Sequence, residues 1–301
     1  MIPRSDSEVP AFTSALGLPG LADLHLHFLP DPVQAKVWAF FDRASAEYGT
    51  EWPIHYRLPA DERLAVLRDL GVRHFAPLVY PHKPDMAAWL NDWVHDFAAA
   101  IPEAVPTATF FPEPGAVGYL TAALDRGARC VKAHVQVGAY DPRDPLLDGV
   151  WGLIAEAGVP VVVHCGHGPV PGKFTGLDVF EDVLRAHPRL TAVLAHAGAP
   201  DHAVALDLAD RYGGVHLDTT MVGVEFNRAV DNLPPDWAAR LAGIAGKVAL
   251  GTDFPSIPYD YATQLAAIVT WADADDRLGA DFLADVLWHT PRRLLAVGEH
   301  D

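Results

Sequence analysis

Residues 159–165 read Val-Pro-Val-Val-Val-His-Cys, an apolar run that ends at a histidine. An uninterrupted valine-rich run of this length is typical of a strand buried on both faces, as in a parallel sheet. Two neighbouring runs have the same form, RCVKAHV at 129–135 and LTAVLAH at 190–196. We therefore predict that residues 159–165 form a central strand of a parallel sheet.

Outward from this segment, apolar runs alternate with longer amphipathic stretches, as expected of successive βα units. The predicted strands cover residues 21–27, 72–80, 105–111, 129–135, 159–165, 190–196, 215–218 and 247–253. The predicted helices cover 59–71, 84–100, 114–127, 145–158, 176–187, 200–212, 235–245, 259–275 and 279–296. No linker divides this pattern, so we predict one α/β domain over residues 1–301, a (β/α)8 TIM barrel.

One connection is too long for an ordinary loop. Residues 28–58, after the first strand, are rich in aromatic side chains. Long ordered loops at the carboxyl end of a barrel strand are usually lids or pocket walls. We expect an insertion that covers the substrate, although these aromatic residues could equally anchor an extra helix on the barrel.

Composition limits the partners. The chain has 22 basic and 39 acidic residues and a formal charge of −17, which argues against nucleic acid and against an anionic membrane surface. No charged-then-apolar leader and no run near the ~20 apolar residues of a membrane span is found, so we expect a cytoplasmic protein. Its two cysteines, Cys130 and Cys165, are expected to be small core residues.

The histidines carry the chemistry. His25 and His27 are spaced by two, so both side chains point to the same side of a strand, here the barrel interior. Asp23, also in phase, either supports them or makes a hydrogen bond at the start of the strand. Burying two unpaired imidazoles is costly, so the pair indicates half of a metal site.

Further candidates recur at the ends of later strands. Lys132, His164 and His196 are separated by 32 residues each, and Asp253 follows 57 residues after His196. One βαβ step takes ~30 residues, so these side chains should ring the carboxyl end of the barrel, where barrel enzymes place their active sites.

Neutral imidazole nitrogens and a carboxylate suit Zn²⁺, with Mn²⁺ or Fe²⁺ as substitutes. We predict that one divalent metal binds four residues and keeps a position open for water, as catalytic sites do. These ligands are His25, His27, His164 and Asp253.

In their order along the chain, these motifs resemble those of the amidohydrolase superfamily. HLH ends the first strand, VVVHCG the fifth, LAHAG the sixth and GTDFP the eighth. The resemblance covers nearly the whole chain and is to the branch of aminocarboxymuconate-semialdehyde decarboxylase-like enzymes and hydrolases. It implies a mononuclear site in which His196 positions or deprotonates the water and Asp253 is both ligand and proton acceptor.

In binuclear relatives the sixth-strand histidine binds a second metal and a carboxylated lysine on the fourth strand bridges the pair. Lys132 keeps that option open. We favour an unmodified Lys132 that contacts a substrate carboxylate or pairs with an acid, beside two further candidate substrate contacts, His134 and His167. A polar loop residue is an equal interpretation of His167.

Asp218 ends the short seventh strand, where it either supports the site from behind or caps the next turn. The remaining histidines are expected to be structural or solvent-facing. They are His55, His74, His82, His95, His187, His202, His216, His289 and His300.

We expect a metal-dependent hydrolase that directs a metal-activated water at an amide, ester or lactone of a small molecule. A metal-dependent decarboxylase of a small carboxylated substrate is the main alternative, because relatives of that kind use the same four ligands. A barrel that binds metal or ligand without catalysis is the alternative of another class. Relatives often form dimers, so a homodimer is an expectation from the resemblance alone.

Overall fold

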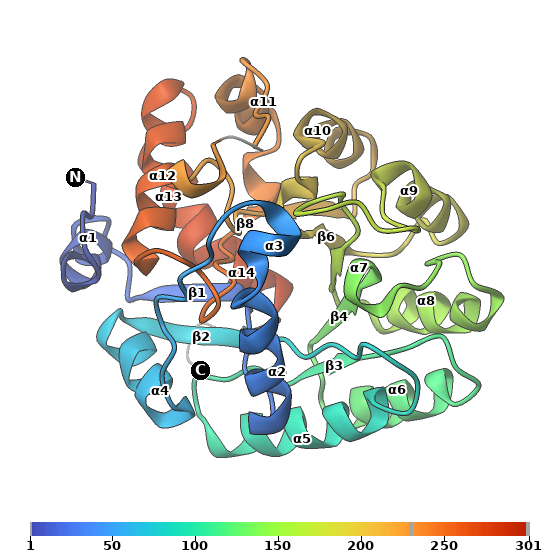
Figure 1. Cartoon of the computed structure of the whole chain (residues 1–301). Helices are drawn as coiled ribbons and strands as arrows, with labels where there is room; N and C mark the ends of the chain where they lie inside the picture. Colours follow the sequence, from blue (N-terminus) through green and yellow to red (C-terminus); the bar gives the residue numbers. More distant parts are fainter. Residues whose placement is uncertain (1, 229–230, 299–301) are drawn as a thin grey trace.

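Eight parallel strands surround a central axis in the computed structural model, which describes residues 2–228 and 231–298 (Figure 1). Strands β3 to β8 pair consecutively and β1 pairs with β2. The contacts that link these sheets include a bridge between Phe75 and Ala104 and a hydrogen bond of 2.9 Å from Leu24 N to Leu250 O. The predicted (β/α)8 TIM barrel is confirmed.

Each observed strand lies within a predicted one. They are β1 (Leu21–Leu26), β2 (Val72–Pro77), β3 (Thr107–Thr109), β4 (Cys130–His134), β5 (Val161–His164), β6 (Ala192–Leu194), β7 (Val215–Asp218) and β8 (Val248–Ala249). The outer helices are α4 (Ala60–Asp69), α5 (Ala87–Ala100), α6 (Ala116–Asp125), α8 (Pro145–Ala157), α9 (Leu177–Ala186), α10 (His202–Arg211), α11 (Trp237–Gly243) and α12 (Tyr261–Ala274). Near the end of the chain, α13 (Gly279–Ala284), a π-helical turn (Asp285–His289) and α14 (Thr290–Leu294) replace one long predicted helix.

The eighth strand is much shorter than predicted. It ends at Ala249, and the chain then turns across β1, because the amides of Thr252 and Asp253 both donate to the carbonyl of His25, at 3.0 and 2.9 Å. Gly251 makes this approach feasible, since a Cβ there would lie 2.8 Å from the Cβ of His25. Asp253 is therefore a loop residue, not the end of a strand.

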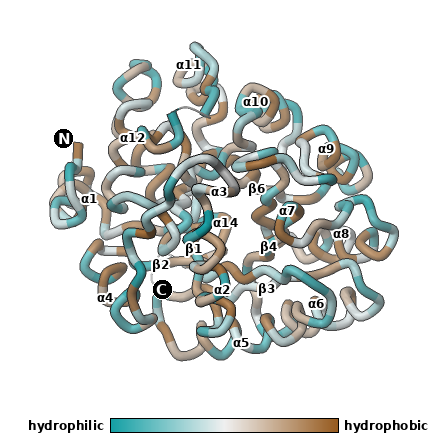
Figure 2. Tube along the Cα trace, viewed as in Figure 1, coloured by the Kyte–Doolittle hydropathy of each residue, from teal (hydrophilic) through white to brown (hydrophobic). Residues whose placement is uncertain are grey.

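The barrel interior is divided into an apolar floor and a polar upper layer. The floor contains Leu24, Cys130, Val162 and Val193 and is closed by Leu294 of α14. Figure 2 shows apolar residues concentrated along the strands, around β4 and β6 for example. Both cysteines are buried and free, as expected. No helix in the described part of the chain is long and apolar enough to cross a membrane.

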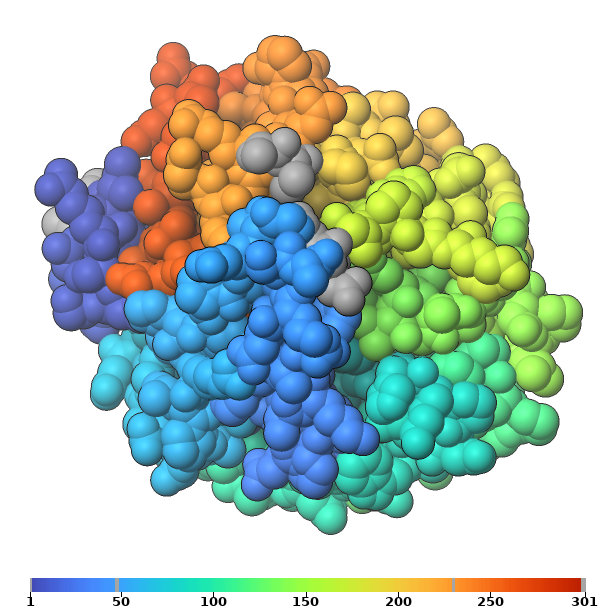
Figure 3. Space-filling view, in the orientation of Figure 1, coloured from blue at the N-terminus to red at the C-terminus, as the bar shows by residue number. Residues whose placement is uncertain are grey.

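The insertion at 28–58 contains two helices, α2 (Asp31–Phe41) and α3 (Ala44–Tyr48), where the alternative interpretation expected one extra helix. In the space-filling view this segment lies across the middle of the face seen down the barrel axis (Figure 3). Trp52 fixes its far end: Nε1 donates to Ser256 O at 2.7 Å, and the ring lies 4.9 Å from that of Phe226. That the segment covers a substrate stays a prediction.

Replacing Trp52 with alanine should loosen the insertion without unfolding the barrel, because its contacts with Ser256 and Phe226 join the insertion to two separate barrel loops. We expect several-fold faster proteolysis within residues 42–55 and an unchanged circular dichroism spectrum. Trp89→Ala is the matched control, since that side chain is 46% exposed. Equal proteolysis of both variants would contradict the proposed anchoring.

Candidate active site

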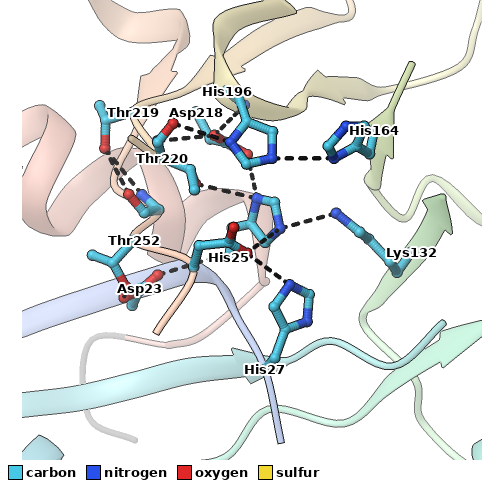
Figure 4. Close-up of polar contacts among 12 residues, drawn as sticks. Asp23, His25, His27, Lys132, His164, His196, Asp218, Thr219, Thr220 and Thr252 are labelled. Atoms are coloured by element: carbon cyan, nitrogen blue, oxygen red, sulfur yellow. Dashed lines mark hydrogen bonds and ion pairs between the residues drawn. The ribbon is translucent and has the colours of Figure 1, made fainter. Parts of the chain in front are cut away.

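The HLH motif reaches the site through an irregularity in β1. The pairing of β1 with β2 is interrupted between Asp23 and Leu26, so Leu24 faces the barrel floor and His25, its neighbour, also turns inward. Asp23 lies apart and accepts from Thr252 Oγ1 at 2.6 Å and from Tyr261 OH at 2.9 Å (Figure 4). The prediction that Asp23 is in phase with the histidines is therefore wrong, and its alternative role as a hydrogen-bond acceptor in the strand is confirmed.

In both His25 and His27 the outer ring nitrogen, Nδ1, which faces away from the centre of the site, is hydrogen-bonded to an acceptor. His25 Nδ1 lies 2.8 Å from Asp218 Oδ2, and His27 Nδ1 lies 2.8 Å from the carbonyl oxygen of Leu78. A carbonyl only accepts, and the carboxylate of Asp218 is ionised, so each Nδ1 carries the hydrogen. Each Nε2 is then left with a lone pair directed into the site.

His164 and His196 show the same arrangement. His164 Nε2 donates to Gly168 O at 2.9 Å, and His196 Nδ1 donates to Thr220 O at 3.2 Å. Their inner nitrogens, His164 Nδ1 and His196 Nε2, face each other at 3.1 Å (Figure 4). Two lone pairs at this distance repel unless a proton or a metal cation lies between them.

Asp253 and His27 form a second pair of acceptors that needs a cation between them. Asp253 Oδ1 lies 2.9 Å from His27 Nε2 and 3.6 Å from His25 Nε2. The His27 nitrogen has its hydrogen on the other side of the ring, so its contact with the carboxylate also needs a shared cation. Within the described residues, His25, His27 and Asp253 form the group whose ligand atoms lie close enough to hold one metal ion.

Lys132 is the buried cation of this site. Its side chain is fully buried, and Nζ donates to His25 Nε2 at 2.9 Å. Among the described residues no carboxylate oxygen lies within ion-pair distance of it, so the expected alternative of pairing with an acid is wrong. Burial lowers the pKa of Lys132 to about 8, against the charges of Asp253 and Asp218.

Asp218 organises the upper layer. Besides His25, it accepts from the backbone N–H of His196 at 2.8 Å and of Thr220 at 3.1 Å. Burial opposes its charge, but His25, His196 and Lys132 hold its pKa at about 2. Both roles predicted for Asp218 are confirmed, because it supports a site histidine and also caps the following turn.

Two site residues have left-handed backbone conformations. His196 has φ 55° and Asp253 has φ 66°, which are unfavourable for residues with a Cβ and are found at sites whose surroundings enforce them. The turn after His196 is held by His202, a buried residue of α10 whose Nδ1 donates to Ala197 O at 3.0 Å. The other nitrogen of His202 contacts the carboxylate of Asp231.

Burial keeps three histidines of the site, His25, His134 and His164, neutral at pH 7. Burial lowers the pKa of His25 to about 4, with a further contribution from Lys132. Burial likewise holds the pKa of His164 and of His134 well below the ordinary value. The pKa of Asp253 is also held well below its usual range, because the contacts with His27, His25 and His196 outweigh its burial.

Six aromatic rings form a closed circuit around this centre. Consecutive ring centroids lie 4.2 to 5.4 Å apart, in the order His25, His27, Tyr80, His134, His164, His196 and back to His25. His134 thus lies beside the candidate metal ligands, and its role as a substrate contact stays a prediction. Tyr80 was missed, although it ends the predicted second strand and that position could have identified it.

The remaining candidates lie outside this circuit. His167 Nδ1 pairs with Asp201 Oδ2 at 2.7 Å in the loop after β5, and a third of its side chain is exposed. Its role as a substrate contact stays a prediction. His300 lies outside the described residues.

The donor set fits a divalent metal. Outer-nitrogen partners of this kind fix the tautomer and orientation of metal-binding imidazoles in known metal sites. His25, His27 and Asp253 would hold the metal, and Nδ1 of His164 is directed inward as the predicted fourth ligand. The fourth ligand and the identity of the metal as zinc remain predictions.

A parallel barrel with convergent imidazoles and a carboxylate at the carboxyl ends of its strands is a metal-dependent enzyme. The sequence profile of the amidohydrolase family matches residues 22–297. The chain belongs to the amidohydrolase family, which confirms the resemblance seen in its motifs.

Solved structures agree on the fold. An uncharacterised TIM-barrel protein, Bb4693 from Bordetella bronchiseptica, has a TM-score of 0.71 at 18% identity, over 92% of this chain and 98% of that one. A 5-carboxyvanillate decarboxylase from Sphingomonas paucimobilis has a TM-score of 0.60 at 16% identity, over 93% and 100%. Another, from Novosphingobium aromaticivorans, complexed with manganese and 4-hydroxy-3-methoxy-5-nitrobenzoic acid, has a TM-score of 0.60 at 14% identity, over 94% and 97%. No curated protein matches the chain.

Asp218→Asn should weaken metal binding by about 10- to 100-fold, because the amide no longer fixes the tautomer of His25 by charge. Competition with a chromophoric chelator measures this affinity. Asp201→Asn is the matched control, since Asp201 also accepts from a histidine Nδ1 but lies outside the site. Unchanged affinity in Asp218→Asn would refute the supporting role of Asp218.

The metal-free protein should lose stability as the pH falls from about 6.5 to about 4. The imidazole of His25 titrates near 6.5 when unfolded and near 4 when folded, so the unfolded chain binds more protons in this window. At pH 5 the protonation of His25 in the unfolded chain should lower the free energy of unfolding by about 2 kcal/mol. Urea unfolding of chelator-treated protein at pH 7.5 and 5.0 measures the loss.

The His25→Asn variant is the control for that titration. It should lose less stability than the wild type over the same pH range, and an equal loss would contradict the assignment to His25. Metal affinity should fall over this range too, because protons compete for the same lone pairs.

Proposed function

We propose that this protein is a metal-dependent decarboxylase, a lyase that releases CO2 from a small carboxylate-bearing molecule. The observation that carries the proposal is Lys132, a buried ammonium group beside the metal ligands with a neutral imidazole as its hydrogen-bond partner. A buried charge is costly unless an opposite charge pairs with it, and a substrate carboxylate would supply that charge. Two of the similar structures are named as decarboxylases, which supports this choice over the hydrolase expected from the sequence.

The chain would divide the work of this reaction among its own residues. A divalent metal, when bound, supplies Lewis-acid polarisation of a substrate oxygen. Lys132 binds and orients the carboxylate. The bond between that carboxylate and the adjacent carbon breaks, the electron pair stays on the carbon, and CO2 leaves.

The carbon that loses CO2 must then gain a proton. His196 is the candidate donor of this proton, because its Nε2 faces the site and lies 3.1 Å from Nδ1 of His164. His134 and Tyr80, the neighbouring members of the ring circuit, would form a flat wall beside the substrate. Asp253 would hold the metal together with His25 and His27 and would keep these imidazoles in place.

A hydrolase is the second candidate, and the carboxylate of Asp253 favours it. Its side chain is 21% exposed and stays ionised at neutral pH, so it can take a proton from an attacking water. In this reaction water would be added across an amide, ester or lactone bond and no CO2 would form.

The two functions differ in their products. We expect metal-loaded protein, given a panel of ¹³C-carboxyl-labelled acids and of matched amides, esters and lactones, to release labelled CO2. In D2O, deuterium should appear at the carbon that lost it. Acid, alcohol or ammonia release without CO2 would instead establish the hydrolase, and a chelator should abolish either activity.

Two variants test the assigned roles within the same assay. Asp253→Asn should lower turnover by at least about a hundredfold with the fold intact, since it removes a charged ligand. Lys132→Met should abolish turnover yet stabilise the metal-free fold by about 1–3 kcal/mol, because a buried charge is replaced by an apolar side chain of similar length. An active or destabilised Lys132→Met protein would contradict the role of Lys132.

A further inference from the structure

A second polar pocket lies at the opposite end of the barrel, where β5, β6 and β7 begin. It has a volume of about 540 Å³ and is lined by short segments before these strands and by the end of α14. The polar side chains at its wall include His216, Arg189, Arg293 and Thr191, and none of the described residues that line it is acidic.

His216 is a polar residue within the apolar floor of the barrel. It lies in register with Val193 of β6, which belongs to that floor, and is only 6% exposed. Its Nδ1 donates to Gly214 O at 3.2 Å, so Nε2 carries a lone pair. Nε2 has no partner within the described residues and is not sealed from solvent, so it is an acceptor open to the pocket.

Two guanidinium groups face the same pocket without a carboxylate partner. Arg189 makes no hydrogen bond or ion pair within the described residues, and Arg293 donates only to Gly246 O at 2.6 Å. Elsewhere on the surface arginines such as Arg143 and Arg277 pair with aspartates. Because acidic residues outnumber basic ones by 39 to 22, a cationic pocket without an acid is unusual in this chain.

We propose that this pocket binds inorganic phosphate in its hydrogen phosphate form. The two arginines supply charge and N–H donors for its oxygens, as guanidinium groups do for phosphate generally. The Nε2 lone pair of His216 would accept from the remaining O–H of the ion. A fully deprotonated oxyanion would instead place an oxygen against that lone pair and be repelled.

The protonation state of His216 agrees with this assignment. Burial, with the charges of Arg293 and Lys247, lowers its pKa to about 4, against the hydrogen bond to Gly214. The ring is therefore neutral at pH 8 and acts as an acceptor there.

The test is equilibrium dialysis of labelled inorganic phosphate against chelator-treated protein at pH 8. We expect one phosphate per chain, and at least tenfold weaker binding of sulfate and of methyl phosphate. Neither competitor carries an O–H at this pH, since the second pKa of a phosphate ester is about 6. The Arg189→Ala/Arg293→Ala protein should lose phosphate binding.

Two controls locate the bound ion. Arg73→Ala removes an exposed arginine from the start of β2, at the same end of the barrel but outside the pocket, and should bind normally. Lys132→Met removes the cation of the metal site and should also bind normally. Phosphate binding that survives in the double variant, or that is lost in Lys132→Met, overturns the proposal.

A third variant addresses selectivity. His216→Phe keeps a ring in the floor but removes the acceptor, so phosphate and sulfate should bind alike. Equal binding of the two ions by the wild type, or no phosphate binding at all, would overturn the proposal. If the double variant misfolds, Arg189→Ala alone provides the comparison, since that side chain makes no hydrogen bond or ion pair with the other described residues. The test needs no substrate, so its outcome is independent of the proposed decarboxylase function.

Discussion

The site depends on where four imidazoles place their outer N–H groups. Each outer nitrogen donates to a fixed acceptor, and three of the four acceptors are backbone carbonyls. The inner nitrogens are therefore obliged to present lone pairs to one small volume, together with the carboxylate of Asp253. Such a concentration of acceptors is stable only around positive charge, and the barrel strands are stiff enough to keep the acceptors from separating.

Lys132 follows from the same constraint. Its ammonium group supplies charge to this volume but pairs with no carboxylate among the described residues, and a buried cation in this state lowers the stability of the fold. A substrate carboxylate that binds at Lys132 would supply the missing negative charge, which gives the buried ammonium group a function. The metal ligands and the anion contact thus belong to one electrostatic arrangement.

The sequence was sufficient for the barrel and for His25, His27 and Asp253, the residues that could hold one metal ion, because the order and spacing of the βα units decide which side chains meet. It was insufficient where the backbone conformation decides how a side chain is oriented or which tautomer a histidine adopts. The irregularity in β1 that turns Asp23 away leaves no mark in residue identity, and neither do the carbonyls of Leu78, Gly168 and Thr220 that fix the tautomers. Tyr80 had a usable signal, since it ended a predicted strand, but an aromatic residue there is equally consistent with packing.

The left-handed backbone at His196 and Asp253 has a consequence for anyone who would rebuild this centre elsewhere. Copying the side chains onto another barrel would not reproduce it, because an unconstrained loop would relax and swing the imidazole and the carboxylate outward. The transplant would have to carry the turn braced by His202 and the loop folded over His25 as well. The two loops that hold His196 and Asp253 are therefore as much a part of the site as the ligand side chains.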